Sequence, residues 1–295
     1  MSEISTVQVM ELRNMTGAGV MDCKNALIES KGDLELAIEH LQMQGKLKVR
    51  KRSGKDVSEG LVGVVHSGYE KAAIIEVNVE TDSMARNSDF QDIVYKIANI
   101  ALSTDGSVGN IMSFPFDNTG ITVEEKLNNH IAIVGENIKL SRAELLSVSD
   151  GVVASYIHSV YAQSLGKIGV LIALKSLGDK EKLSSIGEQI AMHVAASSPL
   201  AISVETIDHS IIAKRRAYYM KEMLDSGKSE AMIEKIVDGK MRKFFKEVVL
   251  LSQDFIVDSS KTVLDFLKES EKVVDAPIEV VGMVHFVLGD WVKSV

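Results

Sequence analysis

The sequence predicts an α+β protein: a small helical domain, a duplicated antiparallel sheet-and-helix core, and an inserted antiparallel helical hairpin. Helical periodicity fills the first 45 residues, and strand periodicity appears twice, at 60–80 and 151–176, each time followed by an amphipathic helix. A helix–turn–helix pattern begins near residue 208. We place the domains at 1–55, 56–145, 146–203 with 246–295, and 204–245, whereas the length of 295 residues alone predicts two or three domains.

The first domain is expected to be a bundle of three short helices. The first helix ends near residues 16–19, where two glycines permit a tight change of direction. A second helix is expected over 22–30. Asp33 is a suitable N-cap for a third helix, and Gly45 is a suitable stop.

A strongly basic segment, KLKVRKRSGK, follows at residues 46–55. One interpretation is an RNA-associated adaptor that binds nucleic acid through this segment, and the other is a solvated, partly helical tether. Nucleic-acid binding needs clustered positive charge, whereas the chain carries a net charge of −8, and no aromatic residue interleaves with these cations for base stacking. We therefore favour the tether and expect no direct nucleic-acid binding.

The core is expected to contain two copies of a strand–strand–helix unit. Residues 60–80 form two antiparallel strands around the turn HSGYEK, and residues 151–176 repeat this pattern around HSVY. The recurrence of HSGY at His66 as HSVY at His158 indicates a duplication.

Helix ends in the core are marked by capping residues. Ser88 with Gln91, and Thr122 with Glu125, have the spacing of capping boxes, in which two side chains satisfy free backbone N–H groups. The helix of the second unit is expected to end before Pro199.

The inserted segment 208–250 predicts two helices joined by a turn at residues 226–228, with Ser229 as the N-cap of the second helix. Such a hairpin projects and packs on itself or on a partner, so a homodimer through the hairpin is left open. A helix over 261–270 and a strand over 279–291 complete the second unit.

The sequence shows no clear metal-binding, phosphate-binding or catalytic motif. His66, His158 and His193 have no neighbours at metal-ligand spacing, so structural roles are favoured over a metal-dependent hydrolase. The phosphate-loop fragment GKS at 227–229 has Glu222 where that motif requires glycine. We expect no catalytic residue, no metal and no cofactor, and a protein that is not an enzyme.

The compartment is suggested by cysteine usage and hydropathy. Cys23 is the single cysteine, which fits a reducing compartment, and no apolar run is long enough to cross a bilayer. The first ten residues show neither a secretory nor a transit pattern. We expect a cytoplasmic protein without a membrane partner.

Two segments together resemble one family. LRNMTGAGVMDCKNAL, at 12–27, resembles the N-terminal signature of translation elongation factor Ts, and EVNVETDSMARN, at 76–87, resembles that family's second signature, E-x-N-x-E/Q-T-D-F-V-A. The resemblance continues in the expected order through 133–142, 190–199, 226–244 and 277–286. It therefore spans nearly the whole chain.

The resemblance implies a guanine-nucleotide exchange factor that acts in protein biosynthesis on GDP-bound and nucleotide-free elongation factor Tu. It also implies that residues 1–55 form a UBA-like domain docking on the GTPase, and that the hairpin is a coiled-coil or dimerisation module. In the family, a T-D-F-V turn dislodges the Mg²⁺ of the GTPase. The matching positions here are Thr81, Asp82, Ser83 and Met84. The implied N-terminal docking face consists of Arg13, Val20, Met21 and Lys24.

The sequence departs from the family pattern in the turn. Ser83 replaces the usual phenylalanine, and Met84 replaces the usual valine. An aromatic wedge would bury a large apolar area worth roughly 2 kcal/mol, which serine cannot supply. Either the flexible Met84 takes part of that role, or Met84 points into the protein's own core and the turn acts through Asp82 alone.

Overall fold

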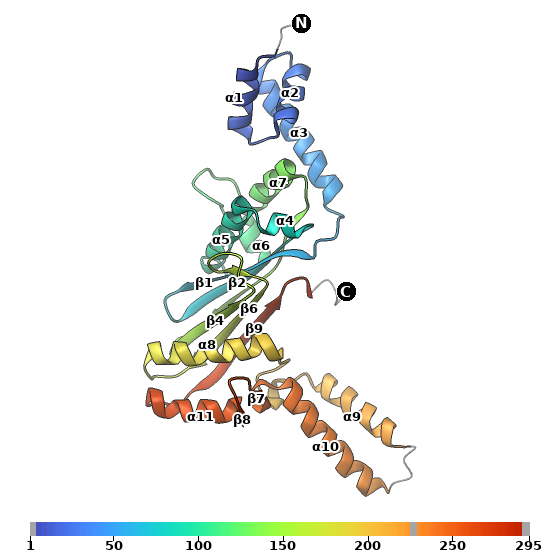
Figure 1. Cartoon of the computed structure of the whole chain (residues 1–295), viewed down its shortest axis with the longest axis vertical. Helices are drawn as coiled ribbons and strands as arrows, with labels where there is room; N and C mark the ends of the chain where they lie inside the picture. Colours follow the sequence, from blue (N-terminus) through green and yellow to red (C-terminus); the bar gives the residue numbers. More distant parts are fainter. Residues whose placement is uncertain (1–3, 225–228, 291–295) are drawn as a thin grey trace.

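The computed structural model describes residues 4–224 and 229–290 and confirms the α+β class. The molecule is elongated, with the N-terminal helices at one end and the helical hairpin projecting near the other (Figure 1). Between them lies a core of two stacked antiparallel sheets. Within the described ranges, no helix has the length and hydropathy that a membrane span requires.

The N-terminal unit contains α1 (Thr6–Thr16), α2 (Val20–Glu29) and α3 (Leu34–Arg52). Asp33 caps α3 as predicted, because its carboxylate accepts the N–H groups of Glu35 and Leu36. Gly17 adopts a left-handed conformation that ends α1, and α2 starts two residues earlier than predicted. The small core of this unit is formed by Val9, Leu12, Cys23, Ala26, Leu27 and Ala37.

The prediction that Gly45 ends the third helix is wrong. Helix α3 continues through Gly45 to Arg52, so most of the expected tether is helical. The glycine is explained by packing, since a Cβ atom at position 45 would lie 3.0 Å from the Cβ of Ala132 on α7 (Val123–Val134). Its missing side chain therefore lets α3 approach the core closely.

The core has four layers: helices, sheet, sheet, helices (Figure 1). The first sheet has the order β3-β2-β1-β5 and consists of β1 (Glu59–Ser67), β2 (Lys71–Val79), β3 (Ile138–Ser147) and β5 (Leu165–Gly166). The second has the order β4-β6-β9 and consists of β4 (Gly151–His158), β6 (Ile168–Lys175) and β9 (Glu279–Val287). The outer layers contain α4 (Asp82–Ala85), α5 (Ser88–Leu102), α6 (Val108–Ser113) and α7 over the first sheet, and α8 (Lys180–Ser197) and α11 (Val263–Val274) over the second.

The central strands are apolar on both faces because each sheet lies between helices and the other sheet. In β2, Ala73, Ile75 and Val77 pack against the helices, whereas Ala72 and Ile74 pack against the second sheet. The same alternation occurs in β6. Side chains of a strand point to opposite faces in turn, so a strand buried on both sides has a nearly continuous apolar sequence.

The duplication extends further than the sequence indicated. The helices α7 and α11 are both 12 residues long, both open with a capping box and both end in a left-handed residue. Each leads into a third strand, β3 or β9, that pairs antiparallel with the second strand of its repeat through a register shift. The box of Thr122 and Glu125 is confirmed.

The predicted Ser88–Gln91 capping box is wrong. Asn87 is the N-cap of α5, and its side chain accepts the N–H of Phe90. The amide of Gln91 instead donates to the carbonyl of Ala85, at the end of α4. The asparagine precedes the serine and already satisfies the helix start, which leaves Ser88 as the first helical residue.

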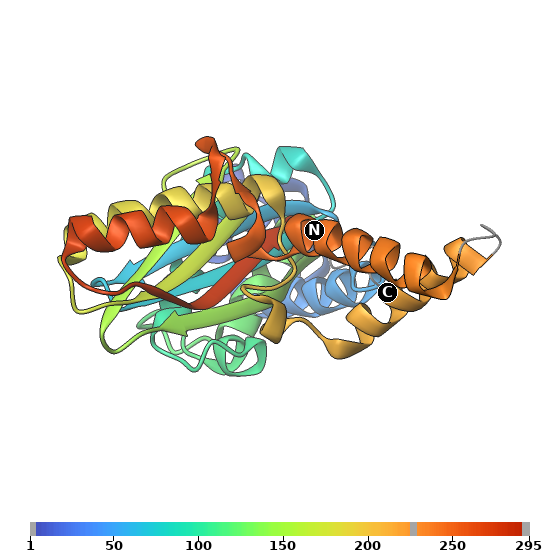
Figure 2. The ribbon, with the colours of Figure 1, turned by 90° about the horizontal axis from the view of Figure 1, so that it is seen from below.

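The hairpin consists of α9 (His209–Leu224) and α10 (Glu230–Val248) and projects from the body (Figure 2). Ion pairs Arg216–Asp238 and Lys240–Glu222 join the two helices at 2.8 Å each. The predicted turn at 226–228 lies outside the described residues. The remaining short elements are two 3₁₀ turns (Val204–Thr206 and Leu250–Ser252), β7 (Asp254–Phe255) and β8 (Asp258–Thr262).

Candidate functional site

The acidic stretch after β2 is a helix start. Thr81 is the N-cap of the single-turn helix α4, and its hydroxyl accepts the N–H of Met84. Glu136, just beyond α7, accepts the Thr81 N–H at 3.1 Å and its hydroxyl at 2.8 Å. We call Thr81–Met84 the bend. It is fixed by Glu136 through both the backbone N–H and the side-chain hydroxyl of Thr81.

Asp82 lies in a cluster of donors. Its Oδ1 accepts the hydroxyl of Tyr161 at 2.6 Å and faces Lys167 Nζ at 3.2 Å, while its Oδ2 accepts Arg86 Nε at 3.0 Å. These contacts favour the ionised carboxylate and lower the pKa of Asp82 to about 2, with the Tyr161 hydroxyl as the largest cause. The carboxylate is charged at physiological pH, and 40% of the side chain remains exposed.

Met84 and Ser83 point in different directions from the bend. Met84 is 7% exposed and packs in the core between the first sheet and its helices, whereas Ser83 is exposed. Of the two alternatives for Met84, the structure shows the inward one. An aromatic ring does lie at the bend, but it is Tyr161 of the second repeat, with Arg86 Cζ 4.8 Å from the ring centroid.

The end of α3 is attached to the same bend. Arg52 Nη1 lies 3.2 Å from the carboxylate of Glu80, which also accepts the N–H of Asn137 at 2.7 Å. Earlier in the helix, Lys48 Nζ lies 2.9 Å from Asp22 and 3.4 Å from the carbonyl oxygen of Ala132. Two cations of the basic segment thus join the N-terminal unit to the core.

The predicted N-terminal face lies at the corner between α1 and α2. Val20 and Met21 are 42% and 63% exposed, and Arg13 and Lys24 are also exposed. Because Lys24 is one helical turn from Val20 and Met21, these three side chains share one side of α2. The structure therefore leaves this face free for a contact.

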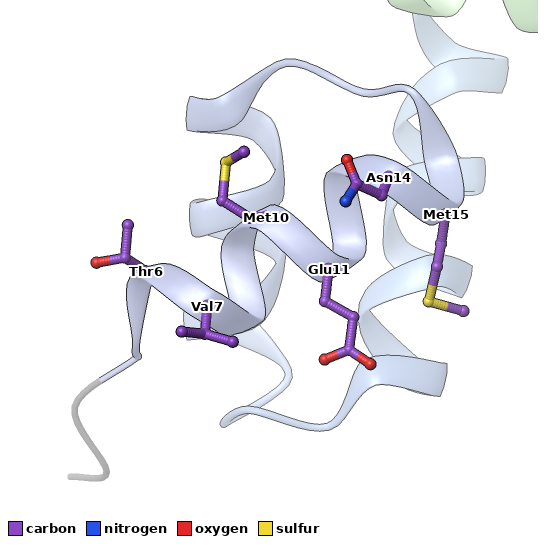
Figure 3. A pocket seen from close by; sticks show the side chains of 6 residues that line it. All are labelled: Thr6, Val7, Met10, Glu11, Asn14 and Met15. Carbon is purple, nitrogen blue, oxygen red and sulfur yellow. The ribbon is translucent and has the colours of Figure 1, made fainter.

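Apolar side chains also line the outer face of α1, which sequence reasoning did not single out. Val7, Met10 and Met15 are 74%, 45% and 61% exposed and border a shallow pocket (Figure 3). The lining residues are Thr6, Val7, Met10, Glu11, Asn14 and Met15. Exposed apolar area next to the predicted face is typical of a protein–protein contact.

The three histidines considered for a metal site have hydrogen-bond partners within the protein. His66 Nε2 lies 2.7 Å from the hydroxyl of Ser155, and His158 is paired with Tyr156. His193 is fully buried between Gln253 and the N–H of Ile256. Among residues 4–224 and 229–290, no group of three or more histidine, cysteine or carboxylate side chains is placed to hold a metal ion.

Comparisons with known proteins identify the family. A model of the family "Elongation factor TS" matches residues 80–290. The protein named elongation factor Ts of Rhizobium leguminosarum bv. trifolii (strain WSM2304) is 50% identical over 294 residues, covering 100% of this chain and 95% of its own length. The elongation factor Ts of Rhizobium meliloti (strain 1021) is 49% identical over 291 residues, covering 99% of this chain and 94% of its own.

The chain belongs to the elongation factor Ts family. The resemblance recognised in the signatures at 12–27 and 76–87 is thereby confirmed. The family match begins at Glu80, so the bend lies inside it. Sequence reasoning missed Glu136, Tyr161 and Lys167, although the recurring HSVY contains Tyr161 and pointed to the loop in question.

Proposed function

We propose that this chain is the guanine-nucleotide exchange factor of elongation factor Tu and promotes GDP release during translation elongation. Family membership supports the partner, and the charged, partly exposed Asp82 on a fixed bend supports the contact. Exchange makes and breaks no covalent bond, so no catalytic residue is assigned.

The physical basis of exchange is linkage between two binding equilibria. A factor that binds the empty GTPase more tightly than the GDP-bound form must weaken GDP binding. The ratio is the same as that by which GDP weakens binding of the factor. Each tenfold change takes about 1.4 kcal/mol of differential contact. A few side chains held in one geometry are therefore sufficient.

The bend at Thr81–Met84 is the proposed site of that differential contact, where it would disturb the Mg²⁺ and nucleotide site of the GTPase. The Asp82 carboxylate is presented at a helix start fixed by Glu136, so little conformational entropy is lost when a partner binds it. With Met84 buried, Asp82 and the exposed Ser83 are the contact groups of the bend itself.

The corner of α1 and α2 is the proposed second contact, with Arg13, Val20, Met21 and Lys24 on the docking face. Helix α3 joins this corner to the bend through Lys48 and the Arg52–Glu80 pair. Because the two contacts are held on one connected scaffold, binding at one increases the effective concentration of the other.

Release of labelled GDP from elongation factor Tu tests the proposal. The chain should accelerate release at catalytic concentrations, and Asp82→Ala should reduce this effect by about tenfold, which corresponds to loss of one charge-assisted contact. Glu70→Ala removes a carboxylate from an exposed ion pair elsewhere and is the matched control. No acceleration by the wild-type chain at saturating concentration would disprove the proposal.

A further inference from the structure

The bend is completed by a loop from the other repeat. Residues 159–164 leave β4 and return along the first sheet, where β5 pairs with β1. The loop is held by the Tyr161 N–H, which donates to the carbonyl of Leu165 at 2.9 Å, and by Ser159 and Ser164 in left-handed conformations. Such conformations are unfavourable for residues other than glycine, so the surrounding contacts must fix this path.

The loop and the residue after β5 bring two donors to one oxygen of Asp82. Tyr161 of the loop and Lys167, just after β5, both contact Oδ1, while Arg86, directly after α4, contacts Oδ2. A carboxylate has about four acceptor positions, two on each oxygen. Among the described residues, Tyr161 and Arg86 donate hydrogen bonds to the carboxylate and Lys167 pairs with Oδ1 at 3.2 Å, which leaves one acceptor position, on Oδ2.

We propose that Tyr161 and Lys167 are positioning residues for nucleotide exchange, holding the Asp82 carboxylate so that one acceptor position on Oδ2 is left for an N–H donor of the partner. This inference rests on the proposed exchange function and adds to it two residues from outside the signature at 76–87. The ring of Tyr161 packs partly against the core of the first sheet, which limits the directions from which its hydroxyl reaches Asp82.

A carboxylate on a short side chain turns readily when it has only one partner. Arg86 alone would leave Asp82 free to rotate, because Arg86 directly follows the same short helix and its side chain is 67% exposed. Tyr161 and Lys167 contact the other carboxylate oxygen, and Arg86 Nη2 also donates to the Tyr161 hydroxyl at 3.4 Å, so the three groups together fix the plane of the carboxylate. The chain thus prepares the contact before a partner arrives.

Tyr161→Phe is the decisive variant because it removes only the hydroxyl. Release of labelled GDP from elongation factor Tu is measured over a range of factor concentrations, together with thermal unfolding of the factor. We expect the concentration needed for half-maximal stimulation to rise about fivefold, as for loss of the hydrogen bond to Asp82, with the melting temperature nearly unchanged because the second contact of the hydroxyl, to Arg86 at 3.4 Å, is long and exposed. Tyr69→Phe, at a tyrosine 47% exposed in the β1–β2 turn, is the matched control and should have no effect.

A double-mutant cycle separates positioning from a general structural role. If Tyr161 acts through Asp82, Tyr161→Phe should change exchange little when Asp82→Ala, which removes the acceptor, is already present. Lys167→Met should likewise have an effect in the wild-type background and little effect beside Asp82→Ala. Equal effects of Tyr161→Phe in both backgrounds would overturn the inference.

The outcomes also separate this inference from the proposed function. A wild-type chain without effect on GDP release would refute both. An active wild type matched or exceeded by Tyr161→Phe would refute the positioning role alone, because the hydroxyl would then be neutral or would compete with the partner for Asp82.

Discussion

An ion pair of the first sheet that also contacts the end of β9 in the second sheet provides a strong test of the fold. Glu76 of β2 is fully buried, and its Oε2 accepts Arg142 Nε from β3 at 2.6 Å. Its Oε1 accepts both the N–H of Gly289, just after β9, and the side-chain amide of Asn78 on β2, each at 2.9 Å. Arg142 also donates to the carbonyl of Val287 at 2.8 Å. One carboxylate therefore joins both sheets, and we predict that Glu76→Ala is strongly destabilising.

The expected loss of folding stability follows from the polar groups that lose Glu76 as their partner. An unpaired buried N–H, here that of Gly289, costs about 1–3 kcal/mol, and breaking a buried ion pair costs about 3–5 kcal/mol in all. Arg142 is 27% exposed and keeps the Val287 carbonyl, which places the expected loss at the lower end, about 3 kcal/mol. For a chain of this size the melting temperature should fall by roughly 6–12 °C.

Denaturant unfolding followed by circular dichroism measures this loss. Glu70→Ala, which breaks the exposed pair with Lys180, is the control and should cost less than about 1 kcal/mol. The double variant Glu76→Leu with Arg142→Met replaces both charges by apolar groups and should recover part of the stability, because the charge left without its partner is removed while the Gly289 N–H still lacks its acceptor. A loss below about 1 kcal/mol for Glu76→Ala, or a double variant no better than the single, would refute the reasoning.

Four further predictions concern single residues. The pKa of Asp82 lies at about 2 instead of 3.8, so its contribution to folding is present above pH 3.8 and lost as pH falls through about 2; an NMR titration should find the carboxylate still ionised at pH 3.8. Burial lowers the pKa of His193, so the unfolded chain binds the proton more readily; stability should fall as pH drops below 6.5, and less steeply in His193→Gln, as measured by denaturant unfolding at pH 7 and 5.5. Gly45→Val should force α3 away from Ala132 and raise hydrogen exchange in α7, with the sheets unaffected. Met84→Ala should cost about 2–4 kcal/mol through a core cavity, and a variant of unchanged melting temperature would contradict its inward position.

The sequence was sufficient to predict the strands and helix ends that depend on local patterns alone. The strand pairs at 60–80 and 151–176 alternate between two buried faces, and the Thr122–Glu125 box is a local pattern that needs no tertiary information. Gly45 was misassigned because its role depends on packing against Ala132. That residue is 87 positions away in the chain, and no pattern in the sequence around Gly45 indicates the contact. Local reasoning treats glycine as a helix stop and cannot detect a helix crossing.

The candidate site shows the same division. The signature indicated Asp82, but the direction of Met84 depends on how a single-turn helix packs on the first sheet. Tyr161 and Lys167 were out of reach because a loop of the second repeat had to be placed on the first sheet before either could be connected with Asp82. Contacts between repeats are long-range, and periodicity carries no information about them.

The comparison of the two repeats suggests where the specialised contact came from. In the first repeat, eight residues, 80–87, separate the second strand from the following long helix, and they contain α4 with Asp82. In the second repeat only four residues, 176–179, make this connection, and Asp179 caps α8 directly. The extra helical turn is thus the difference between the repeats at this connection. Its acidic contact residue is oriented by a loop of the second repeat, so neither repeat alone would present Asp82 as the whole chain does.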